Sequence, residues 1–352
     1  MNLLVKIAPL LLLFMSCKKK DDPKGNQVFL EKGVLVLSEG LFQQNNASLT
    51  YYDDKYDVLH QSFYLNNNDE MLGDVANDML RYGGKIYIVL NNSNLITVLD
   101  AYSGVVLKKI PMTDSGTGRS PRNIVGYENK IYVCSFDGTI IKMDTSTLYP
   151  ENIIQIGRNP DGMAISNGKL YVSNSGGLDF PNYDMTVSVI DLQSFQELNR
   201  ITVGKNPGSI VSDFEGDIYL IKRGDYGSDS TRLLRIDPLS GVVVQEFSGL
   251  NITQIFSTGM GIYFVHTDAY GNHPKLGVID TDTEMVTDSN WFDISHVQTL
   301  YAIHVDEPNS SIYLMDAHNY SSSGTIYVHS FSGSLIRQIN TGYLPKKVVI
   351  FE

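Results

Sequence analysis

The sequence predicts an all-β protein, a seven-bladed β-propeller that is closed by its C-terminal strand. A unit of about 45 residues recurs seven times along the chain of 352 residues, which is the period of propeller blades. Each unit holds four short segments of alternating apolar and polar residues, separated by turn residues. One strand pattern is left over after the seventh unit, and the first unit lacks one. These observations predict a single propeller domain over residues 33–352.

The second strand of the unit carries the clearest repeat, an aliphatic residue followed by tyrosine. Six copies are plain, and Val34-Leu35 is a weaker seventh. The six are Ile86-Tyr87, Ile131-Tyr132, Leu170-Tyr171, Ile218-Tyr219, Ile262-Tyr263 and Ile312-Tyr313. The first strand often begins with Pro-x-x followed by Ile or Met, as it does at Pro121 and Pro160. Because the same buried pattern returns in each unit, the blades are expected to pack on one another in the same way.

Closure of the ring is predicted from the two ends of the repeat. Residues 345–351 have the pattern of an inner first strand, like that of residues 121–125, but no further strands follow them. The first unit runs from Val34 to about Tyr64 without such a strand. We therefore expect the C-terminal strand to complete the first blade, which leaves no open radial edge.

The N-terminal residues 1–16 are predicted to be a lipoprotein signal peptide. The apolar run from Ile7 to Met15 is too short to span a membrane, and it ends just before Cys17. This arrangement resembles a bacterial lipoprotein signal in which Cys17 becomes acylated; an ordinary secretory signal is the alternative. Residues 17–32 form a charged tether, similar to the surface-export signal of Bacteroidetes lipoproteins. We expect an outer-membrane protein at the cell surface, with the periplasmic side as the alternative.

Charge and cysteine content narrow the class of partner. The formal net charge of −12 argues against nucleic acid or an anionic membrane surface, so membrane contact is expected through the lipid anchor only. Besides Cys17 the chain has one cysteine, Cys134, in an apolar strand. With Cys17 acylated, Cys134 has no disulfide partner and is expected to be a buried core residue.

One face of the predicted propeller is expected to bind a ligand. In a blade with strands a to d running outward, the d–a and b–c loops share one face, here named the loop face. The a–b and c–d turns share the other, the turn face. The b–c loops are longer and carry aromatic and amide side chains, although they could merely cap the strands. The candidate ligand-binding residues are Phe42, Asn91, Arg122, Phe136, Arg158, Phe180, Tyr183, Arg223, Tyr226, Tyr270, His318, Tyr320 and Tyr343.

Regularly spaced aspartates suggest chemistry but are interpreted as turn caps. The third strand of six units ends in aspartate before a short turn, where the carboxylate can accept backbone N–H groups. They are Asp53, Asp100, Asp144, Asp191, Asp237 and Asp280. Since each lies on a separate blade, they cannot converge. No nucleophile elbow or phosphate loop is present, so no catalytic residue or cofactor is assigned. A metal site is not expected either, with convergence of His266, His273 and His318 as the alternative.

The inner-strand proline pattern, the aliphatic–tyrosine pair and the strand-end aspartate together resemble the YncE-like propeller group over residues 33–352. Combined with Cys17 and the acidic tether, they are similar to the Bacteroidetes surface lipoproteins typified by the cobalamin-binding BtuG. Those proteins sit over a TonB-dependent outer-membrane transporter and pass their ligand to it. The resemblance is one of overall type, and no ligand-contact motif can be matched residue by residue.

The resemblance implies a non-enzymatic protein that captures a scarce, large nutrient, with cobalamin as the leading ligand. An alternative is a ferric siderophore or other anion, bound by cations on consecutive blades. These are Arg119, Arg122, Arg158, Lys205 and Arg223. A protein-interaction or surface-layer scaffold is a further alternative. A lactonase-like enzyme would need carboxylates or histidines converging at the axis, and the sequence shows no such set.

Overall fold

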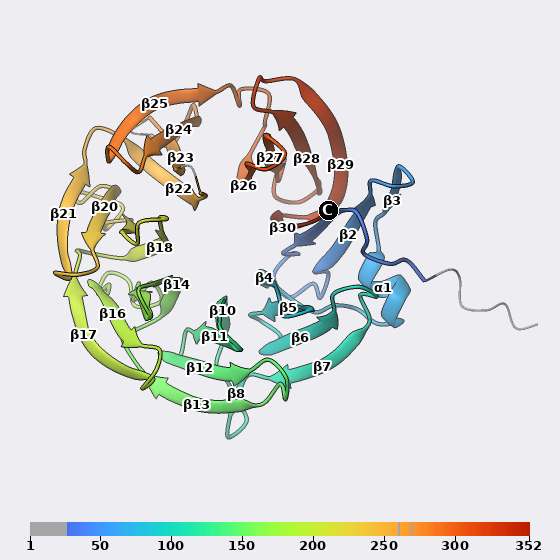
Figure 1. Ribbon diagram of the computed structural model, residues 1–352, viewed down its shortest axis with the longest axis horizontal. Helices are drawn as coiled ribbons and strands as arrows, with labels where there is room; N and C mark the ends of the chain where they lie inside the picture. Colours follow the sequence, from blue (N-terminus) through green and yellow to red (C-terminus); the bar gives the residue numbers. More distant parts are fainter. Residues whose placement is uncertain (1–26, 260, 269) are drawn as a thin grey trace, which may run out of the picture.

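The computed structural model describes residues 27–259, 261–268 and 270–352, which form a closed ring of seven four-stranded antiparallel sheets (Figure 1). This confirms the predicted seven-bladed β-propeller. The signal peptide and the acylation site Cys17 lie outside the described residues. Within the described ranges, no helix is both long enough and apolar enough to cross a membrane.

Each blade is given from the axis outward. Blade 1 comprises β30 (Pro345–Phe351), β1 (Gly33–Ser38), β2 (Ser48–Asp53) and β3 (Val58–His60). Blade 2 comprises β4 (Ala76–Tyr82), β5 (Lys85–Leu90), β6 (Leu95–Asp100) and β7 (Val106–Pro111). Blade 3 comprises β10 (Pro121–Tyr127), β11 (Lys130–Ser135), β12 (Thr139–Asp144) and β13 (Pro150–Gln155). Blade 4 comprises β14 (Pro160–Ser166), β15 (Lys169–Asn174), β16 (Thr186–Asp191) and β17 (Gln196–Thr202).

The remaining blades follow the same order. Blade 5 comprises β18 (Pro207–Ser212), β19 (Ile218–Lys222), β20 (Arg232–Asp237) and β21 (Val242–Phe247). Blade 6 comprises β22 (Asn251–Ser257), β23 (Ile262–Thr267), β24 (Lys275–Asp280) and β25 (Met285–Phe292). Blade 7 comprises β26 (Leu300–Asp306), β27 (Ser311–Asp316), β28 (Ser323–Ser330) and β29 (Leu335–Tyr343). The seven inner strands surround the axis (Figure 1).

The C-terminal strand closes the ring as predicted. β30 pairs with β1 in antiparallel register from Gly33 opposite Phe351 to Ser38 opposite Pro345. The side chains of Val348 and Phe351 are almost fully buried. The innermost strand of the first blade therefore comes from the last residues of the chain, and the two ends of the propeller depend on each other.

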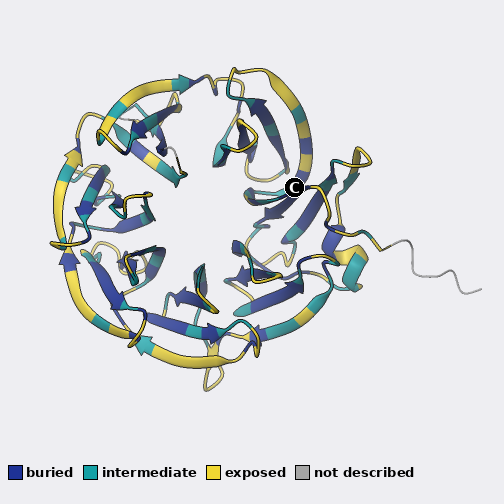
Figure 2. Ribbon diagram, in the orientation of Figure 1, coloured by how far each residue is buried: buried dark blue, intermediate teal, exposed yellow. Residues whose placement is uncertain are grey.

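The hydrophobic core is divided among the seven junctions between neighbouring blades. Each junction has its own cluster of buried side chains, and the outer strands of the blades are largely exposed (Figure 2). The tyrosines of the second strands fill these junctions, and burial raises the pKa of Tyr87 to about 12. Cys134 is fully buried, which raises the pKa of its thiol to about 12 and confirms its place in the core.

The strand-end aspartates cap turns, as the sequence analysis proposed. The Oδ1 atom of Asp144 accepts hydrogen bonds from the backbone N–H groups of Ser146 and Thr147, both at 2.9 Å. The same pattern recurs at Asp53, Asp100, Asp191, Asp237 and Asp280. These carboxylates fix the short c–d turns on the turn face, away from the loops that carry the candidate site.

Two small elements were not predicted. The helix α1 (Phe63–Asn68) joins β3 to β4 and buries Phe63 and Tyr64 against the first blades. A hairpin of β8 (Thr113–Asp114) and β9 (Thr117–Gly118) lies within the connection from blade 2 to blade 3. Neither disturbs the ring, because both lie in d–a connections between complete blades.

Candidate functional site

Every inner strand has a register shift near its start, on the loop face. In blade 2, for example, Ala76 pairs with Leu90 and Asp78 with Val89, which leaves Asn77 between them without a partner in the register. Such β-bulges turn the extra residue out of the ladder and re-aim its side chain. The residues skipped by the pairing include Asn77, Arg122, Asp161, Gly208, Thr253, Tyr301 and Lys346. The bulges therefore place a ring of mostly polar residues at the mouth of the axial channel.

Within this ring, Asp161 forms ion pairs with two arginines. Its Oδ1 atom lies 2.9 Å from Nη2 of Arg122, and its Oδ2 atom lies 2.6 Å from Nη2 of Arg223. The guanidinium of Arg122 also lies over the ring of Phe136, 4.5 Å from its centroid. Burial tends to raise the pKa of Asp161, but the two guanidinium groups outweigh it and lower the pKa to about 2. Asp161 is therefore a fixed anion that holds two arginines together.

The polar ring continues from Arg122 to blades 2, 1 and 7. The amide oxygen of Asn77, oriented to satisfy its neighbours, accepts hydrogen bonds from Arg122 and from Nζ of Lys346. Lys346 is also paired with Glu39, whose Oε2 atom lies 3.0 Å away. The same oxygen accepts a 2.6 Å hydrogen bond from the hydroxyl of Tyr301. Burial and the Glu39 carboxylate both raise the pKa of Tyr301, so it remains a neutral donor.

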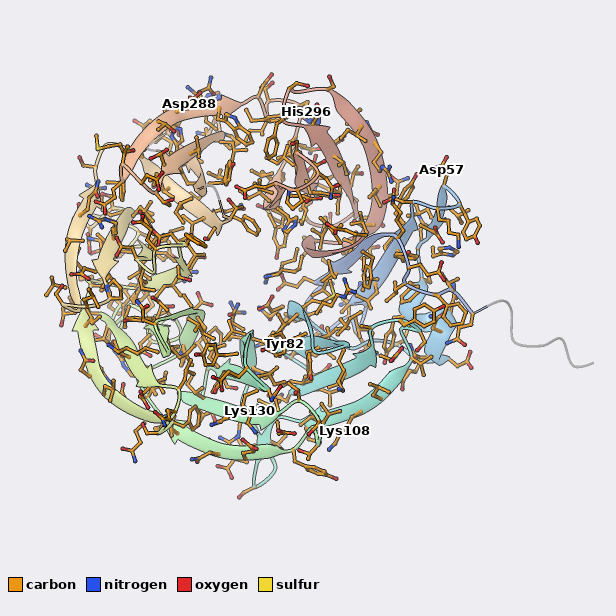
Figure 3. The ribbon with its side chains drawn as sticks, viewed as in Figure 1. Asp57, Tyr82, Lys108, Lys130, Asp288 and His296 are labelled. Atoms are coloured by element: carbon orange, nitrogen blue, oxygen red, sulfur yellow. The ribbon has the colours of Figure 1, made fainter. Side chains whose placement is uncertain are left out.

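Several residues of the ring line a channel cavity of about 640 Å³, which is formed by the inner strands of several blades. A further ion pair lies next to the ring, where Nζ of Lys347 is 3.2 Å from Oδ1 of Asp78. Nearby on β26, burial and the charge of Lys347 lower the pKa of His304 to about 4. Side chains drawn as sticks extend from the inner strands towards the axis (Figure 3). The channel mouth is thus lined by charged groups with defined partners.

Aromatic side chains of the b–c loops form a rim on the loop face. Phe180 and Tyr183 lie edge to face at 5.9 Å between centroids, and Tyr183 lies 6.3 Å from Tyr226 of the next blade. Tyr270 on blade 6 is 90% exposed and Tyr226 is 74% exposed. Phe42, Phe180 and Tyr320 are also exposed. Tyr320 packs against Tyr301 at 6.3 Å, which connects the rim to the polar ring.

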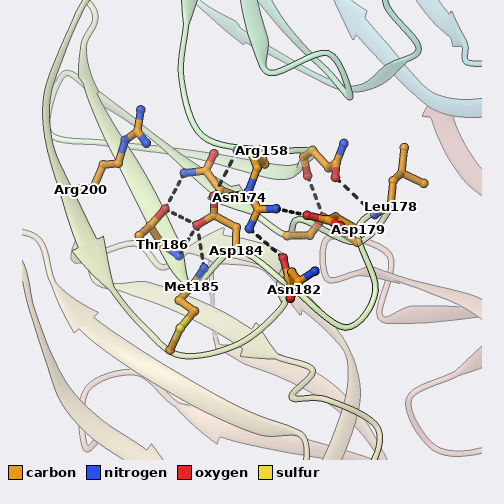
Figure 4. Close-up of polar contacts among 12 residues, drawn as sticks. Arg158, Asn174, Leu178, Asp179, Asn182, Asp184, Met185, Thr186 and Arg200 are labelled. Carbon is orange, nitrogen blue, oxygen red and sulfur yellow. Dashed lines mark hydrogen bonds and ion pairs between the residues drawn. The ribbon is translucent and has the colours of Figure 1, made fainter.

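Arg158 holds a loop in place. Its Nη1 atom pairs with Asp179 at 2.6 Å, and its Nη2 atom donates to the carbonyl oxygen of Asn182 at 2.7 Å (Figure 4). Both partners lie in the loop between β15 and β16, which carries Phe180 and Tyr183. Arg158 therefore supports the aromatic rim, and its charge is partly neutralised by Asp179 and by Asp184, 3.9 Å away.

Two other cations considered as anion ligands are paired as well. Arg119 contacts Asp137 at 2.6 Å and Asp114 at 3.2 Å, and Lys205 contacts Asp225 at 3.0 Å. Asp137 and Asp225 lie in b–c loops, and Asp114 lies in the β8–β9 hairpin of a d–a connection. Of the five cations proposed from the sequence, Arg122 and Arg223 are the two that line the channel cavity.

The remaining candidate residues fall into two groups. Asn91 donates from Nδ2 to the carbonyl oxygen of Pro121 at 3.0 Å, which ties blade 2 to blade 3. His318 and Tyr343 line a separate cavity of about 570 Å³ on the loop face between blades 7 and 1. The Nε2 atom of His318 lies 3.1 Å from Oγ1 of Thr325. These residues share the predicted face, but none of them lines the channel cavity.

The structure does not bring the three histidines together. Nε2 of His266 lies 2.7 Å from the carbonyl oxygen of Ser289, whereas His318 faces Thr325. Among the described residues, no group of three or more His, Cys, Asp or Glu side chains is arranged to hold a metal ion.

The candidate ligand-binding residues from the sequence do not include Asn77, Asp161, Tyr301 or Lys346, nor Glu39 beside them. The available signal was positional, because each of the first four is the second residue of an inner strand. At that position five of the seven inner strands carry a polar residue, whereas β18 carries Gly208 and β22 carries Ile252.

Known structures with this fold differ widely in sequence. A quinonprotein alcohol dehydrogenase-like protein from Bacteroides thetaiotaomicron is 16% identical with a TM-score of 0.63, covering 92% of this chain and 79% of that one. Hydrazine synthase from Kuenenia stuttgartiensis is 18% identical with a TM-score of 0.59, covering 74% and 84%. The β-propeller domain of Cps50 (Swd1) from Myceliophteria thermophila is 11% identical with a TM-score of 0.55, covering 74% and 88%. At these identities the likeness establishes the propeller fold alone.

A curated protein and a family model also match the chain. The pyridoxal 5'-phosphate synthase subunit PdxT of Syntrophus aciditrophicus is 32% identical over 105 residues, which are 28% of this chain. The chain spans only 46% of the length of that protein. The family model described as a domain of unknown function, DUF5074, matches residues 32–240, from the start of β1 to the turn after β20. Because this match covers more than half of the chain, the protein belongs to the DUF5074 family.

Proposed function

We propose that this protein is a non-enzymatic binding protein that captures a large, amide-rich nutrient, with cobalamin as the leading ligand. The observation that carries the proposal is the aromatic rim on the loop face. Phe42, Phe180, Tyr226, Tyr270 and Tyr320 come from five blades, and all are exposed. Exposed aromatic groups on one face of the ring are typical of a recognition surface rather than of a folding core.

The rim suits a broad ligand because several of its rings are held in place by neighbouring side chains. Aromatic side chains lose little rotational freedom on binding and often dominate affinity. The pair of contacts from Phe180 through Tyr183 to Tyr226 spans two blades, and the Arg158 contacts hold the loop that carries two of these rings. A large flat ligand could therefore contact several blades at once without reordering the loops.

The charged groups favour binding over catalysis. The one carboxylate at the centre of the ring, Asp161, has a pKa near 2 and lies between two guanidinium groups, which makes it a poor general base at neutral pH. The strand-end aspartates are occupied as turn caps on the opposite face. A siderophore held by all five candidate cations is less favoured, because Arg119, Arg158 and Lys205 do not line the channel cavity.

Delivery of the ligand is part of the same proposal. We place the protein at the outer membrane, anchored by lipid at Cys17 and facing the cell surface, where it would pass its ligand to a TonB-dependent transporter. The support is the signal-like sequence ending at Cys17 and the charged residues that follow it. A surface-exposed propeller would present its loop face to ligands too large for passive entry.

The double variant Tyr226→Ala and Tyr270→Ala is expected to weaken cobalamin binding by at least tenfold. Loss of two exposed aromatic anchors removes a large part of the contact area, and a tenfold change corresponds to about 1.4 kcal/mol. Isothermal titration calorimetry with cyanocobalamin measures the effect. The matched control is Phe214→Ala, which removes an aromatic group that is 85% exposed in the β18–β19 turn of the opposite face. Absence of any cobalamin affinity in the unaltered protein would reject this ligand.

The variant Cys17→Ala is expected to shift the protein from the membrane fraction to the soluble fraction, or to leave the signal uncleaved. Fractionation of cells and mass analysis of the N-terminus measure this result. The matched control is Cys134→Ala, which alters the buried cysteine of the chain and should leave the protein in the membrane fraction. Digestion of the protein by protease added to intact cells supports the surface location, whereas protection until lysis places it on the periplasmic side.

A further inference from the structure

We infer that the channel mouth is a binding site for a small oxyanion that carries carboxylate or phosphate groups. Four cationic residues, Arg122, Arg223, Lys346 and Lys347, line one cavity of about 640 Å³. The volume lies within the range of small-molecule sites, about 300–1,000 Å³. The lining holds these four cations and two carboxylates, Asp78 and Asp161, so in a protein with a net charge of −12 it would attract anions to the channel.

Within each ion pair of the ring, the cation is the more exposed partner. The side chain of Lys347 is 45% exposed and that of its partner Asp78 is 5% exposed. Arg223 is 33% exposed over Asp161 at 11%. Arg122 and Lys346 show the same order with their carboxylate partners. The carboxylates are therefore the more buried partners, and the N–H donors of the cations are the more accessible to a ligand in the cavity.

The arginine donors are positioned by the fold. Gly208 lies under Arg223, and a Cβ atom at this position would come within 2.4 Å of the guanidinium carbon. The absence of a side chain there lets Arg223 cross the start of β18 and reach Asp161 of blade 4. Since a guanidinium has five N–H groups and the pair with Asp161 is made through Nη2, further donors remain for a second anion.

The buried carboxylates keep the cations in place without cancelling them. Asp161 stays ionised above about pH 2, so it fixes Arg122 and Arg223 throughout the neutral range. Phe136 supports the other face of Arg122. An oxyanion in the cavity would find arginine and lysine groups whose side-chain freedom is already reduced, which lowers the cost of binding. The inference is independent of what the aromatic rim binds, since the cavity lies along the channel rather than on the exposed rim.

Titration of the full chain with citrate and, separately, with inorganic phosphate tests the inference. Calorimetry in a low-salt zwitterionic buffer should show saturable binding of at least one of the two anions, weakened by added sodium chloride. The anion that binds more tightly identifies the carboxylate or the phosphate class. The double variant Arg223→Gln and Lys347→Gln should reduce the affinity at least tenfold, and Arg223→Lys should keep more of it.

The matched control is Lys130→Gln, which removes one positive charge at the outer side of blade 3 (Figure 3). It should leave anion binding within about twofold of the unaltered protein. Thermal melts without added anion show whether each variant is folded. Absence of binding by both anions, or equal loss in the control and the channel variants, would overturn the inference. Cobalamin binding without anion binding would retain the proposed function alone, and the reverse result would retain the anion site alone.

Discussion

Deletion of residues Pro345–Phe351 is expected to have one of two results. Either the chain is already unfolded at room temperature and shows no cooperative unfolding transition, or its melting temperature falls by more than about 10 °C. This strand supplies the whole inner edge of blade 1 through its pairing with β1. Its loss would expose the edge of β1 and remove Val348 and Phe351 from the core. Replacing the buried Phe351 by alanine would by itself lower the free energy of unfolding by about 3–5 kcal/mol. An open ring would also present unpaired strand edges that promote aggregation.

Circular dichroism melts of the deletion variant measure the effect, with light scattering to follow aggregation. Phe351→Ala gives an intermediate case that keeps the backbone pairing, and removal of the exposed Glu352 alone is the matched control. Addition of a peptide that spans residues 345–352 should restore part of the transition. A melting temperature unchanged by the deletion would contradict the closure by β30.

The fold could be predicted because its determinants repeat. The aliphatic–tyrosine pair recurs because each second strand fills the same kind of junction between blades, as Tyr87 and Tyr171 do. The exception, α1, has the sequence Phe-Tyr-Leu-Asn-Asn-Asn, which lacks good helix formers after its first turn. It is stabilised instead by tertiary contacts, since Asn67 donates to the carbonyl oxygens of Val28 and Ser103. Contacts of this kind leave no local signal.

The candidate site was predictable as a face but not as a set of contacts. Strand alternation decides which loops share a face, so the positions of Tyr226, Tyr270 and Arg122 followed from the blade order. The ion pairs did not follow, because the partners are separated along the chain. Arg122 and Asp161 are 39 residues apart and come from different blades. The pairing of Arg158 with Asp179 likewise depends on the path of a long loop. The bulges that aim the polar ring at the channel have no distinct sequence pattern.

Asp161→Ala is expected to destabilise the protein by about 3–5 kcal/mol, because it leaves Arg122 and Arg223 close together without their shared carboxylate. The side chain of Asp161 is only 11% exposed, so water can replace it poorly. Chemical denaturation at pH 7 measures the loss. Asp161→Asn keeps the size of the side chain and should still cost more than the control variant Asp288→Asn, which removes a carboxylate at the outer edge of blade 6 (Figure 3). Surface changes of that kind fall within about 0.5 kcal/mol.

The carboxylate of Asp161 should also make the free energy of unfolding depend on pH in the acid range. The pKa of Asp161 is lowered to about 2 in the folded protein, below the ordinary value of about 3.9 for aspartate in an unfolded chain. A lowered pKa means that the stabilisation is complete above about pH 4 and is lost as the pH falls through about 2. The loss amounts to about 2 kcal/mol over this window. Denaturation curves at several pH values should therefore show a shallower acid dependence in Asp161→Asn than in Asp288→Asn. Equal slopes in the two variants would mean that Asp161 is not the anion on which the two arginines depend.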